Sequence, residues 1–254
     1  MPNLLVEERD GVAWLRLNRP EIRNAFDPPL LAELTEAVRD ARAGVIAITG
    51  TEGSFCAGGY LGDLVDPDPE QVRELFHGTL RLFGEIRGHR APVIAAVNGP
   101  AMGGGNELVV ACDLAIAAES AVFGQTGPRV GSAPVLGGTN LLAMSIGEKR
   151  AKEVSFLCRR YTARQALDMG WVNAVVPDDR LEGEVTAWAG ELLALSGRYL
   201  EIAKVSSNAW WNLCEESFRS GAGMLVQAIG SEDMREGSRA FQEKRRPRFP
   251  TRGS

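Results

Sequence analysis

Residues 92–107 read PVIAAVNGPAMGGGNE, and this stretch decides the fold. Its first half, Val93–Val97, is a short apolar run typical of a strand that is buried on both faces of a parallel sheet. An Asn-Gly-Pro turn ends the run, and three glycines then lead to Glu107 at the start of an expected helix. Backbone N–H groups at a helix N-terminus favour negative charge, and glycine lets a ligand approach the backbone closely. The stretch therefore predicts donors for a developing oxyanion with an acid–base group beside them.

Strands and helices alternate on both sides of this stretch. We expect strands at residues 4–8, 12–18, 45–49 and 114–118, and helices at 28–42 and 69–87. Asp27 is expected to cap the first helix, with Pro28 at its first position. Such alternation predicts an α/β fold with right-handed crossovers around a mostly parallel sheet. From Thr139 onward the chain is expected to be largely helical, and its end, from Asp178, has no obvious core of its own.

The composition is that of a globular protein. The chain has 254 residues, of which 44% are hydrophobic and 24% charged, so it can bury a sizeable core. Its net charge of −5 disfavours binding of nucleic acid, which requires a basic surface. Basic residues gather at Lys244–Arg248, and this segment is either a solvated tail or a phosphate-binding one.

The cysteines, histidines and apolar runs exclude several classes of protein. Four cysteines and two histidines are too scattered for a metal site, so we expect no metal and reduced, buried cysteines. No run approaches the roughly 18 apolar residues of a membrane span, and the N-terminal segment turns acidic too early for a signal peptide. We therefore expect no membrane partner and a cytoplasmic location.

Two further glycine-rich segments have the character of ligand-binding loops. Residues 55–59, FCAGG, follow a buried strand, where α/β sheets bind ligands, although a plain turn accounts for these glycines equally well. Residues 123–139 combine small, polar and rigid residues without periodicity, as functional loops do. Glu107 itself is either a solvated acid or a semi-buried one. The apolar residues 108–111 favour burial, which raises the pKa of a carboxyl toward the range useful for proton transfer.

These segments, in this order and spacing, resemble the crotonase superfamily, which is also called the enoyl-CoA hydratase/isomerase family. The resemblance spans nearly the whole chain and is carried by NRPEIRNAF, FCAGG, APVIAAVNGPAMGGGNELVVACDLAIAAESAVFGQ and TARQALDMGWVNAVVP. It implies a spiral ββα core over residues 1–190 and a helical trimerisation region over residues 191–254. It also implies a homotrimer or homohexamer that acts on CoA thioesters without a prosthetic group.

The family's shared chemistry implies roles for the glycine-rich turns. The backbone N–H groups of Gly59 and Gly104 are expected to hold the enolate oxygen of the thioester, and such donors typically contribute a few kcal/mol each. Ala57 and its neighbour Gly58 are expected to face the adenine of CoA. Arg23 is an expected contact to the CoA phosphates.

The second catalytic glutamate of typical hydratases is absent. Glu107 matches the first one, but the second would fall at position 127, which is glycine. This departure argues against hydration with water held between two carboxylates. The segment Gln125–Pro128, together with the tail that contains Lys244, resembles instead dihydroxynaphthoyl-CoA synthases and ketocyclohexanecarboxyl-CoA hydrolases.

In the bicarbonate-using synthases, a small anion takes the place of the missing glutamate. Here Gln125, Thr126 and Gly127 are expected to border a polar space of carboxylate size, filled by bicarbonate, a substrate carboxylate or water. Ser132 is a further expected substrate contact. Lys244 matches a CoA contact of the synthases, which favours phosphate binding by the basic tail.

The match to the synthases is incomplete. As aligned, Ser155 replaces a tryptophan and Pro134 an acidic residue, and the synthases lack the glutamate that Glu107 provides. We expect a lyase or hydrolase that acts on a β-keto or carboxylated acyl-CoA through a thioester enolate. The alternatives are an ordinary enoyl-CoA hydratase or isomerase, and a catalytically silent acyl-CoA-binding homologue. The acyl group, and the choice between CoA and an acyl-carrier protein, stay open.

Overall fold

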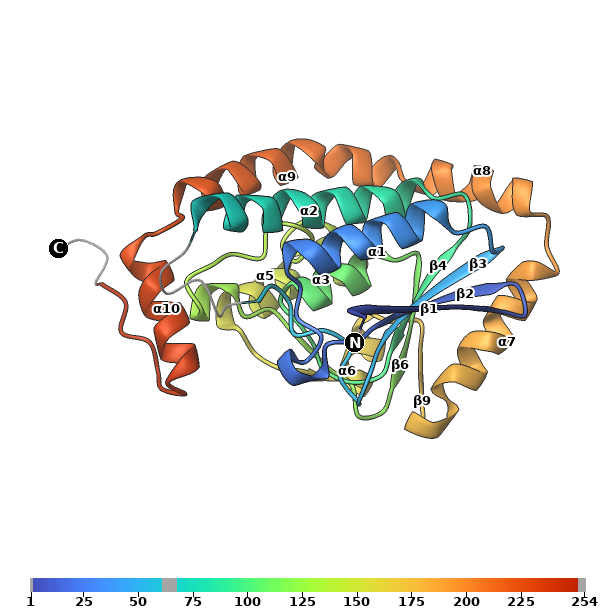
Figure 1. The fold of residues 1–254 in the computed structure, drawn as a ribbon, viewed down its shortest axis with the longest axis horizontal. Helices are drawn as coiled ribbons and strands as arrows, with labels where there is room; N and C mark the ends of the chain where they lie inside the picture. Colours follow the sequence, from blue (N-terminus) through green and yellow to red (C-terminus); the bar gives the residue numbers. More distant parts are fainter. Residues whose placement is uncertain (1, 61–67, 251–254) are drawn as a thin grey trace.

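The computed structural model describes residues 2–60 and 68–250 of the chain. A six-stranded sheet in the order β1-β2-β3-β4-β6-β9 lies at one end of the molecule (Figure 1). Its strands are β1 (Leu4–Arg9), β2 (Val12–Leu17), β3 (Val45–Gly50), β4 (Val93–Val97), β6 (Leu114–Ala118) and β9 (Ala174–Val176). The hairpin of β1 and β2 is antiparallel, and the other pairs in this sheet are parallel. The predicted α/β fold with a mostly parallel sheet is confirmed.

A second, three-stranded sheet has the order β5-β7-β8. Its strands are β5 (Ala101–Met102), β7 (Val122–Gly124) and β8 (Tyr161–Thr162). The turn at residues 98–100 leads from β4 of the large sheet into β5 of the small one, and β6 leads into β7 in the same way. Successive turns of the chain thus place one strand in each sheet before helical segments follow, which confirms the predicted spiral ββα core.

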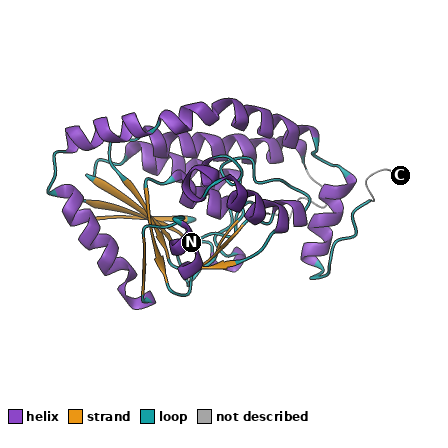
Figure 2. Cartoon of the chain, turned by 180° about the vertical axis from the view of Figure 1, so that it is seen from behind, coloured by secondary structure: helices purple, strands orange, loops and turns teal. Residues whose placement is uncertain are grey.

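Helices cover both faces of the larger sheet (Figure 2). One face packs on α1 and α2, which lie side by side, and the other face packs on α7. Alternate residues of the strands point to opposite faces, so Leu15 and Ile48 join the first core and Trp14 and Ala47 the second. The helices are α1 (Pro28–Asp40), α2 (Pro69–Gly88), α3 (Gly104–Ala111), α4 (Leu141–Ile146), α5 (Glu148–Leu157), α6 (Ala163–Met169), α7 (Leu181–Leu193), α8 (Gly197–Ser207), α9 (Ala209–Gln227) and α10 (Glu232–Gln242).

Local signals in the sequence set the ends of α1. The Asp27 carboxylate accepts a hydrogen bond from the Leu30 N–H at 2.9 Å, and Pro28 opens the helix, as predicted. The helix ends at Asp40, two residues earlier than expected, because Ala41 leaves the helical conformation. The four cysteines are buried and unpaired, which is also as predicted.

The helical end of the chain packs on the first half. α7 buries Leu181, Val185 and Ala189 against the sheet face that carries Trp14, and position 190, the expected end of the core region, falls inside this helix. α9 lies along α2 (Figure 1). No described helix is long and apolar enough to cross a membrane.

One buried cation anchors α8 to the core. The Nζ of Lys204 donates hydrogen bonds to the carbonyl oxygens of Ile86 at 2.8 Å and Ala91 at 3.0 Å. It also lies 2.7 Å from a carboxylate oxygen of Asp113. Because a buried charge without partners is strongly destabilising, these contacts fix α8 against the starts of β4 and β6.

Candidate active site

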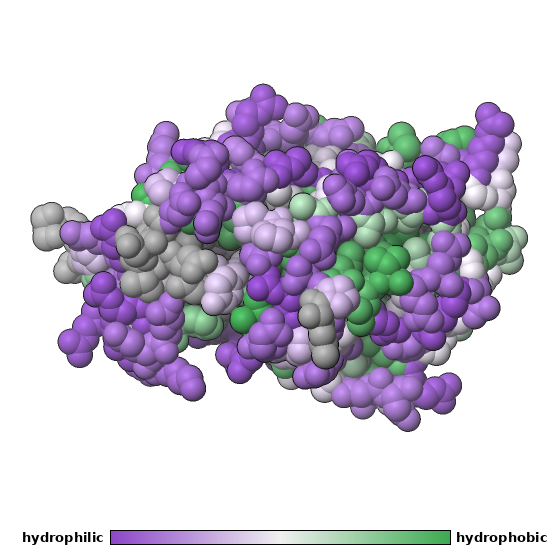
Figure 3. All heavy atoms as spheres, in the orientation of Figure 1, coloured by the Kyte–Doolittle hydropathy of each residue, from purple (hydrophilic) through white to green (hydrophobic). Residues whose placement is uncertain are grey.

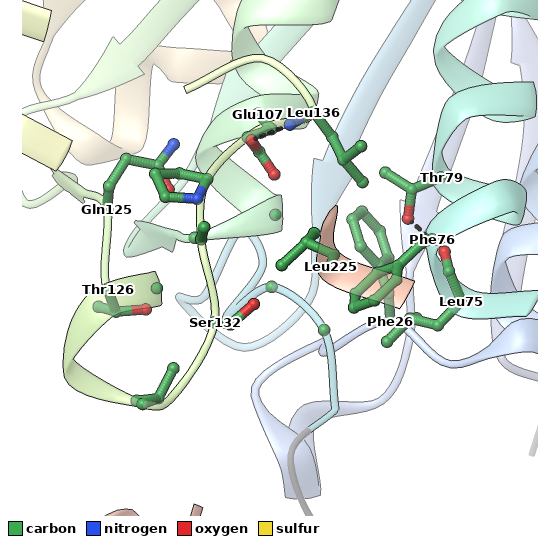
Figure 4. A pocket seen from close by; sticks show the side chains of 18 of the residues that line it. Phe26, Leu75, Phe76, Thr79, Glu107, Gln125, Thr126, Ser132, Leu136 and Leu225 are labelled. Carbon is green, nitrogen blue, oxygen red and sulfur yellow. Dashed lines mark hydrogen bonds between the residues drawn. The ribbon is translucent and has the colours of Figure 1, made fainter. Parts of the chain in front are cut away.

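A cavity of about 90 Å³ lies between the turn after β3, the start of α3, α2 and the loop after β7 (Figure 4). Apolar side chains close it on one side and glycine-rich main chain on the other. The lining residues are Phe26, Ala57, Gly58, Gly59, Leu75, Phe76, Thr79, Gly103, Gly104, Glu107, Gln125, Thr126, Gly127, Val130, Ser132, Ala133, Pro134, Leu136 and Leu225.

Two backbone donors lie close together at the wall of this cavity. Gly104 is the first residue of α3, so its N–H has no acceptor in the helix. Among the described residues, neither this N–H nor that of Gly59 donates to a protein acceptor. A Cβ atom on Gly104 would lie 3.5 Å from the Gly59 nitrogen, so the two groups are neighbours. The structure thus brings Gly59 and Gly104 together at one wall of the cavity, and their role as donors to an enolate oxygen stays a prediction.

Cys56 connects the two segments that carry these donors. Its main chain pairs with the strand that leads to Gly104: the Cys56 N–H donates to the Pro100 carbonyl at 3.1 Å, and the Met102 N–H donates to the Cys56 carbonyl at 3.0 Å. Its Sγ accepts the Gly58 N–H at 3.3 Å. Gly58 has a φ of +93°, which favours glycine, and a Cβ there would lie 2.8 Å from the Gly104 nitrogen. The donor turn is therefore held rigidly.

Glu107 is the buried carboxyl group of the cavity. Its side chain is buried, and its Oε1 accepts N–H bonds from Leu136 at 2.9 Å and Gly138 at 3.0 Å. Burial raises the pKa of Glu107 to about 7, although the two N–H bonds act in the opposite direction. The other carboxyl oxygen points into the cavity (Figure 4). Glu107 is therefore buried rather than solvated, as its apolar neighbours in the sequence indicated, and its carboxyl can both take up and release a proton near neutral pH.

Among the described residues that line the cavity, no side chain besides Glu107 is titratable. Gly127 occupies the position of the expected second glutamate and borders the cavity. However, a Cβ on Gly127 would lie 2.9 Å from Cα of Ala133. The main chain of the following loop therefore occupies the direction in which a side chain at position 127 would point, and the predicted carboxylate-sized space bordered by Gln125, Thr126 and Gly127 stays a prediction.

Gln125 is the polar feature of this part of the cavity. It is fully buried, and neither its amide oxygen nor its amide nitrogen has a hydrogen-bond partner in the described chain. Its amide lies beside the Gly138 residue that binds Glu107, since a Cβ on Gly138 would stand 2.4 Å from Nε2 of Gln125. Thr126 and Ser132 also line the cavity. Unpaired buried amides are costly, so this region favours a bound polar group.

The expected CoA contacts lie outside the cavity or at its edge. Ala57 and Gly58 line it, and the Ala57 N–H donates to the carbonyl of Arg23 at 3.0 Å, so Arg23 adjoins the donor turn with an exposed side chain. Lys244 is exposed just after α10 and is not among the lining residues. In the described part of the chain, no cluster of three or more potential metal ligands occurs.

Several lining residues carry no signal in the sequence. Phe26 lies just before α1, Thr79 lies in α2, and Leu225 comes from α9, far along the chain. No local pattern in the sequence indicates that these three residues border one cavity. The Leu136 and Gly138 donors to Glu107 lie in a loop that the sequence marks as functional, although nothing local indicates their partner.

Comparison with known proteins places this chain in one family. The sequence model of the enoyl-CoA hydratase/isomerase family matches residues 7–252. The chain belongs to this family, the crotonase superfamily, as its motifs indicated. Members of the family act on CoA thioesters without a prosthetic group.

Solved structures of family members are similar over nearly the whole chain. An enoyl-CoA hydratase from Mycobacterium avium subsp. paratuberculosis K-10 is 29% identical with a TM-score of 0.88, covering 98% of this chain and 99% of that chain. An enoyl-CoA hydratase from Bacillus anthracis is 32% identical with a TM-score of 0.79, and the coverage is 98% and 99%. A carnitinyl-CoA hydratase from Mycobacterium avium is 30% identical with a TM-score of 0.86, again covering 98% and 99%.

Proposed function

We propose that this protein is an acyl-CoA enzyme that forms a thioester enolate with Glu107 as its acid–base group. The observation that carries this proposal is the buried carboxyl of Glu107 in one small cavity with the free N–H groups of Gly59 and Gly104. Two such donors stabilise the negative charge that develops on a thioester oxygen. A carboxyl with a pKa of about 7 moves a proton at the adjacent carbon in either direction.

The reaction that one carboxyl serves best is cleavage at the β-carbon of a β-keto or otherwise polar acyl-CoA. Glu107 takes a proton from a water that attacks the β-carbonyl. The bond between the α- and β-carbons then breaks, giving a carboxylic acid and a thioester enolate. Glu107 returns its proton to the α-carbon, so a second protein carboxylate is unnecessary. The unpaired amide of Gln125 supports a polar substrate group beside Glu107, and bicarbonate or water is the alternative occupant.

A second candidate reaction is isomerisation of an enoyl-CoA. One carboxyl can remove a proton from one carbon of the acyl chain and return it two carbons away, and the apolar wall of the cavity accepts a plain hydrocarbon chain. Ordinary hydration is less favoured, because the described cavity residues provide no second carboxylate to hold the water.

A panel of CoA thioesters tests these reactions. We expect measurable turnover of a short β-ketoacyl-CoA and slow hydration of crotonyl-CoA, followed by thioester absorbance and by chromatography of the products. Each substrate is assayed with and without bicarbonate. A 3-enoyl-CoA of the same chain length is assayed separately to test for isomerisation. Fast hydration of crotonyl-CoA without a bicarbonate effect would favour an ordinary hydratase. Binding of several thioesters without any turnover would indicate a silent acyl-CoA-binding homologue.

We place the CoA moiety outside the acyl cavity, along the donor turn. The exposed side chain of Arg23 adjoins Ala57, which supports a contact between this arginine and the CoA phosphates. Lys244 is a second candidate for phosphate binding, from its own subunit or a neighbouring one. The basic tail otherwise folds back on α10, where Arg245 pairs with Glu236 at 2.6 Å.

We further propose that the protein is a homotrimer or homohexamer, with the region from residue 191 onward contributing to assembly. Apolar atoms reach the surface at the end of the molecule where α7 meets α8 (Figure 3). On α8, Tyr199, Ile202 and Val205 recur at helical spacing and are more than half exposed, as are Trp210 and Leu213 on α9. Such an apolar surface is typical of an interface between subunits.

Light scattering coupled to size-exclusion chromatography should give three or six times the mass of one chain. Val205→Glu places a charge in the apolar face of α8 and should shift the mass toward the monomer. Ser206→Glu adds the same charge one residue away and serves as the matched control. A monomeric wild-type protein at micromolar concentration would contradict the assembly.

A further inference from the structure

Ser155 makes an unusual hydrogen bond from inside α5. Its side chain is fully buried, and its hydroxyl donates to the carbonyl oxygen of Gly138 at 3.1 Å. A serine within a helix more often faces solvent or bonds a carbonyl of the preceding turn of its own helix. Here the hydroxyl bonds a carbonyl outside its own helix and connects α5 to the loop that borders the candidate active site.

Gly138 is the link between Ser155 and the acid–base group. While its carbonyl accepts the Ser155 hydroxyl, its N–H donates to Oε1 of Glu107 at 3.0 Å. It follows Gly137, so two glycines in succession would leave this loop conformationally free without an anchor. Gln125 closes the other side of Gly138, where a Cβ would stand 2.4 Å from Nε2. Gly138 is therefore held between a hydroxyl and an amide.

We propose that Ser155 is a positioning residue for catalysis, which holds the Gly138 N–H on the carboxylate of Glu107. It touches neither the cavity nor the reacting atoms, since it is not among the described lining residues. It acts through Gly138, and two hydrogen bonds separate its hydroxyl from the carboxyl of Glu107. This role rests on the proposed acid–base function of Glu107.

The electrostatic consequence has a definite sign. The N–H bonds from Gly138 and Leu136 favour the charged carboxylate and oppose the effect of burial on the pKa of Glu107. Loss of the Ser155 anchor weakens the Gly138 bond, so the pKa of Glu107 should rise further. From α2, α3 and the loop after β7, the described residues that line the cavity with Glu107 present no other titratable or charged side chain. A shift in the pH profile can therefore be assigned to Glu107.

Ser155→Ala tests this role. We expect the apparent pKa in the profile of kcat/KM to move upward by roughly half to one pH unit, as a weakened hydrogen bond to a carboxylate predicts. We expect kcat to fall about three- to tenfold, because proton transfer depends on the position of the carboxyl. An infrared titration of the Glu107 carboxyl stretch, assigned by difference with Glu107→Gln, measures the same rise without any assay of turnover.

Ser238→Ala is the matched control. Ser238 is also a fully buried serine on a helix, α10, but its hydroxyl has no partner within the described chain. Its removal should leave the pH profile and the infrared titration unchanged. Ser155→Cys, which keeps the shape of the side chain with a slightly larger and weaker donor, should give an intermediate upward shift of the pKa. It also replaces the alanine variant if that one fails to fold.

The possible outcomes separate this role from the proposed function. If Glu107→Gln abolishes turnover while Ser155→Ala and Ser155→Cys keep the wild-type pH profile, the positioning role is wrong and the function of Glu107 stands. If Glu107→Gln is fully active, the proposed function fails. In that case, a higher pKa of Glu107 in the infrared titration of Ser155→Ala would still support the structural link between Ser155 and the carboxyl. An equal loss of kcat in Ser155→Ala and Ser238→Ala would indicate a general packing effect and overturn the proposal.

Discussion

Replacing Glu107 by glutamine is expected to lower kcat by about 10²- to 10⁴-fold, the usual contribution of a positioned acid–base group. Glutamine has the same shape, and its carbonyl oxygen can still accept the N–H bonds of Leu136 and Gly138. The variant should therefore keep its fold and bind acyl-CoA, while proton transfer at the substrate stops. Steady-state kinetics and the exchange of substrate α-protons in deuterated water measure the loss. Unchanged turnover would remove Glu107 from the catalytic step.

The same substitution has a second readout in the pH dependence of stability. Folding raises the pKa of Glu107 from 4.5 to about 7, so the folded state binds this proton more tightly than the unfolded one. The resulting stabilisation is fully present below pH 4.5 and is lost as the pH rises through about 7. In Glu107→Gln this contribution to the free energy of unfolding should not change with pH, and urea unfolding of both proteins at pH 5 and pH 8 measures the difference. Glu36→Gln, on the exposed face of α1, is the control. Equal pH dependence of Glu107→Gln and the wild type would contradict the raised pKa.

Gly104→Ala keeps the backbone N–H but is expected to lower kcat by about 10²- to 10³-fold, because a methyl group that displaces the bound oxygen should cost about as much as the loss of one oxyanion donor. A Cβ there would lie at ordinary contact distances of 3.5 Å from Gly58 Cα and 3.6 Å from a ring carbon of Phe26, so the fold should persist. The methyl group would also stand 3.5 Å from the Gly59 nitrogen, where it crowds an oxygen bound between the two N–H groups. Kinetics measure the loss of activity and thermal unfolding measures any loss of stability, so a local effect on the bound oxygen can be told apart from damage to the fold.

Gly84→Ala is the matched control for this variant. Gly84 lies within α2, and a Cβ there meets no atom within 4 Å. Alanine should stabilise the helix by about 0.5–1 kcal/mol and leave kcat unchanged. If Gly104→Ala keeps full activity, the enolate oxygen does not bind between Gly59 and Gly104.

The sequence allowed the fold to be predicted because its signals are local. The apolar run Val93–Val97 and the cap at Asp27 each fix their own element, and the alternation of strands and helices fixes the sheet. The positions of Gly59, Gly104 and Glu107 in one cavity followed from the family resemblance. Residues that match a shared motif keep their places because the spiral core constrains them.

Other parts of the site depend on contacts that no short pattern encodes. The Gly138 N–H reaches Glu107 from a position 31 residues away, and Leu225 reaches the cavity from α9. Gly127 is instructive, because a missing side chain does not imply an empty space. The chain around Ala133 is free to close over a glycine, and the amino-acid sequence does not reveal how far it closes.

The two donors that line the cavity with Glu107 belong to the main chain, and Cys56 connects their segments from within the core. Every amino acid except proline supplies an N–H group, so most single substitutions cannot delete such a donor. The surrounding wall, by contrast, is built of side chains such as Leu75, Leu136 and Leu225, which vary without disturbing the donors. If the two N–H groups stabilise an enolate as proposed, most substitutions leave that capacity intact, while changes in the wall and in the loop beside Gln125 can alter the substrate and the reaction.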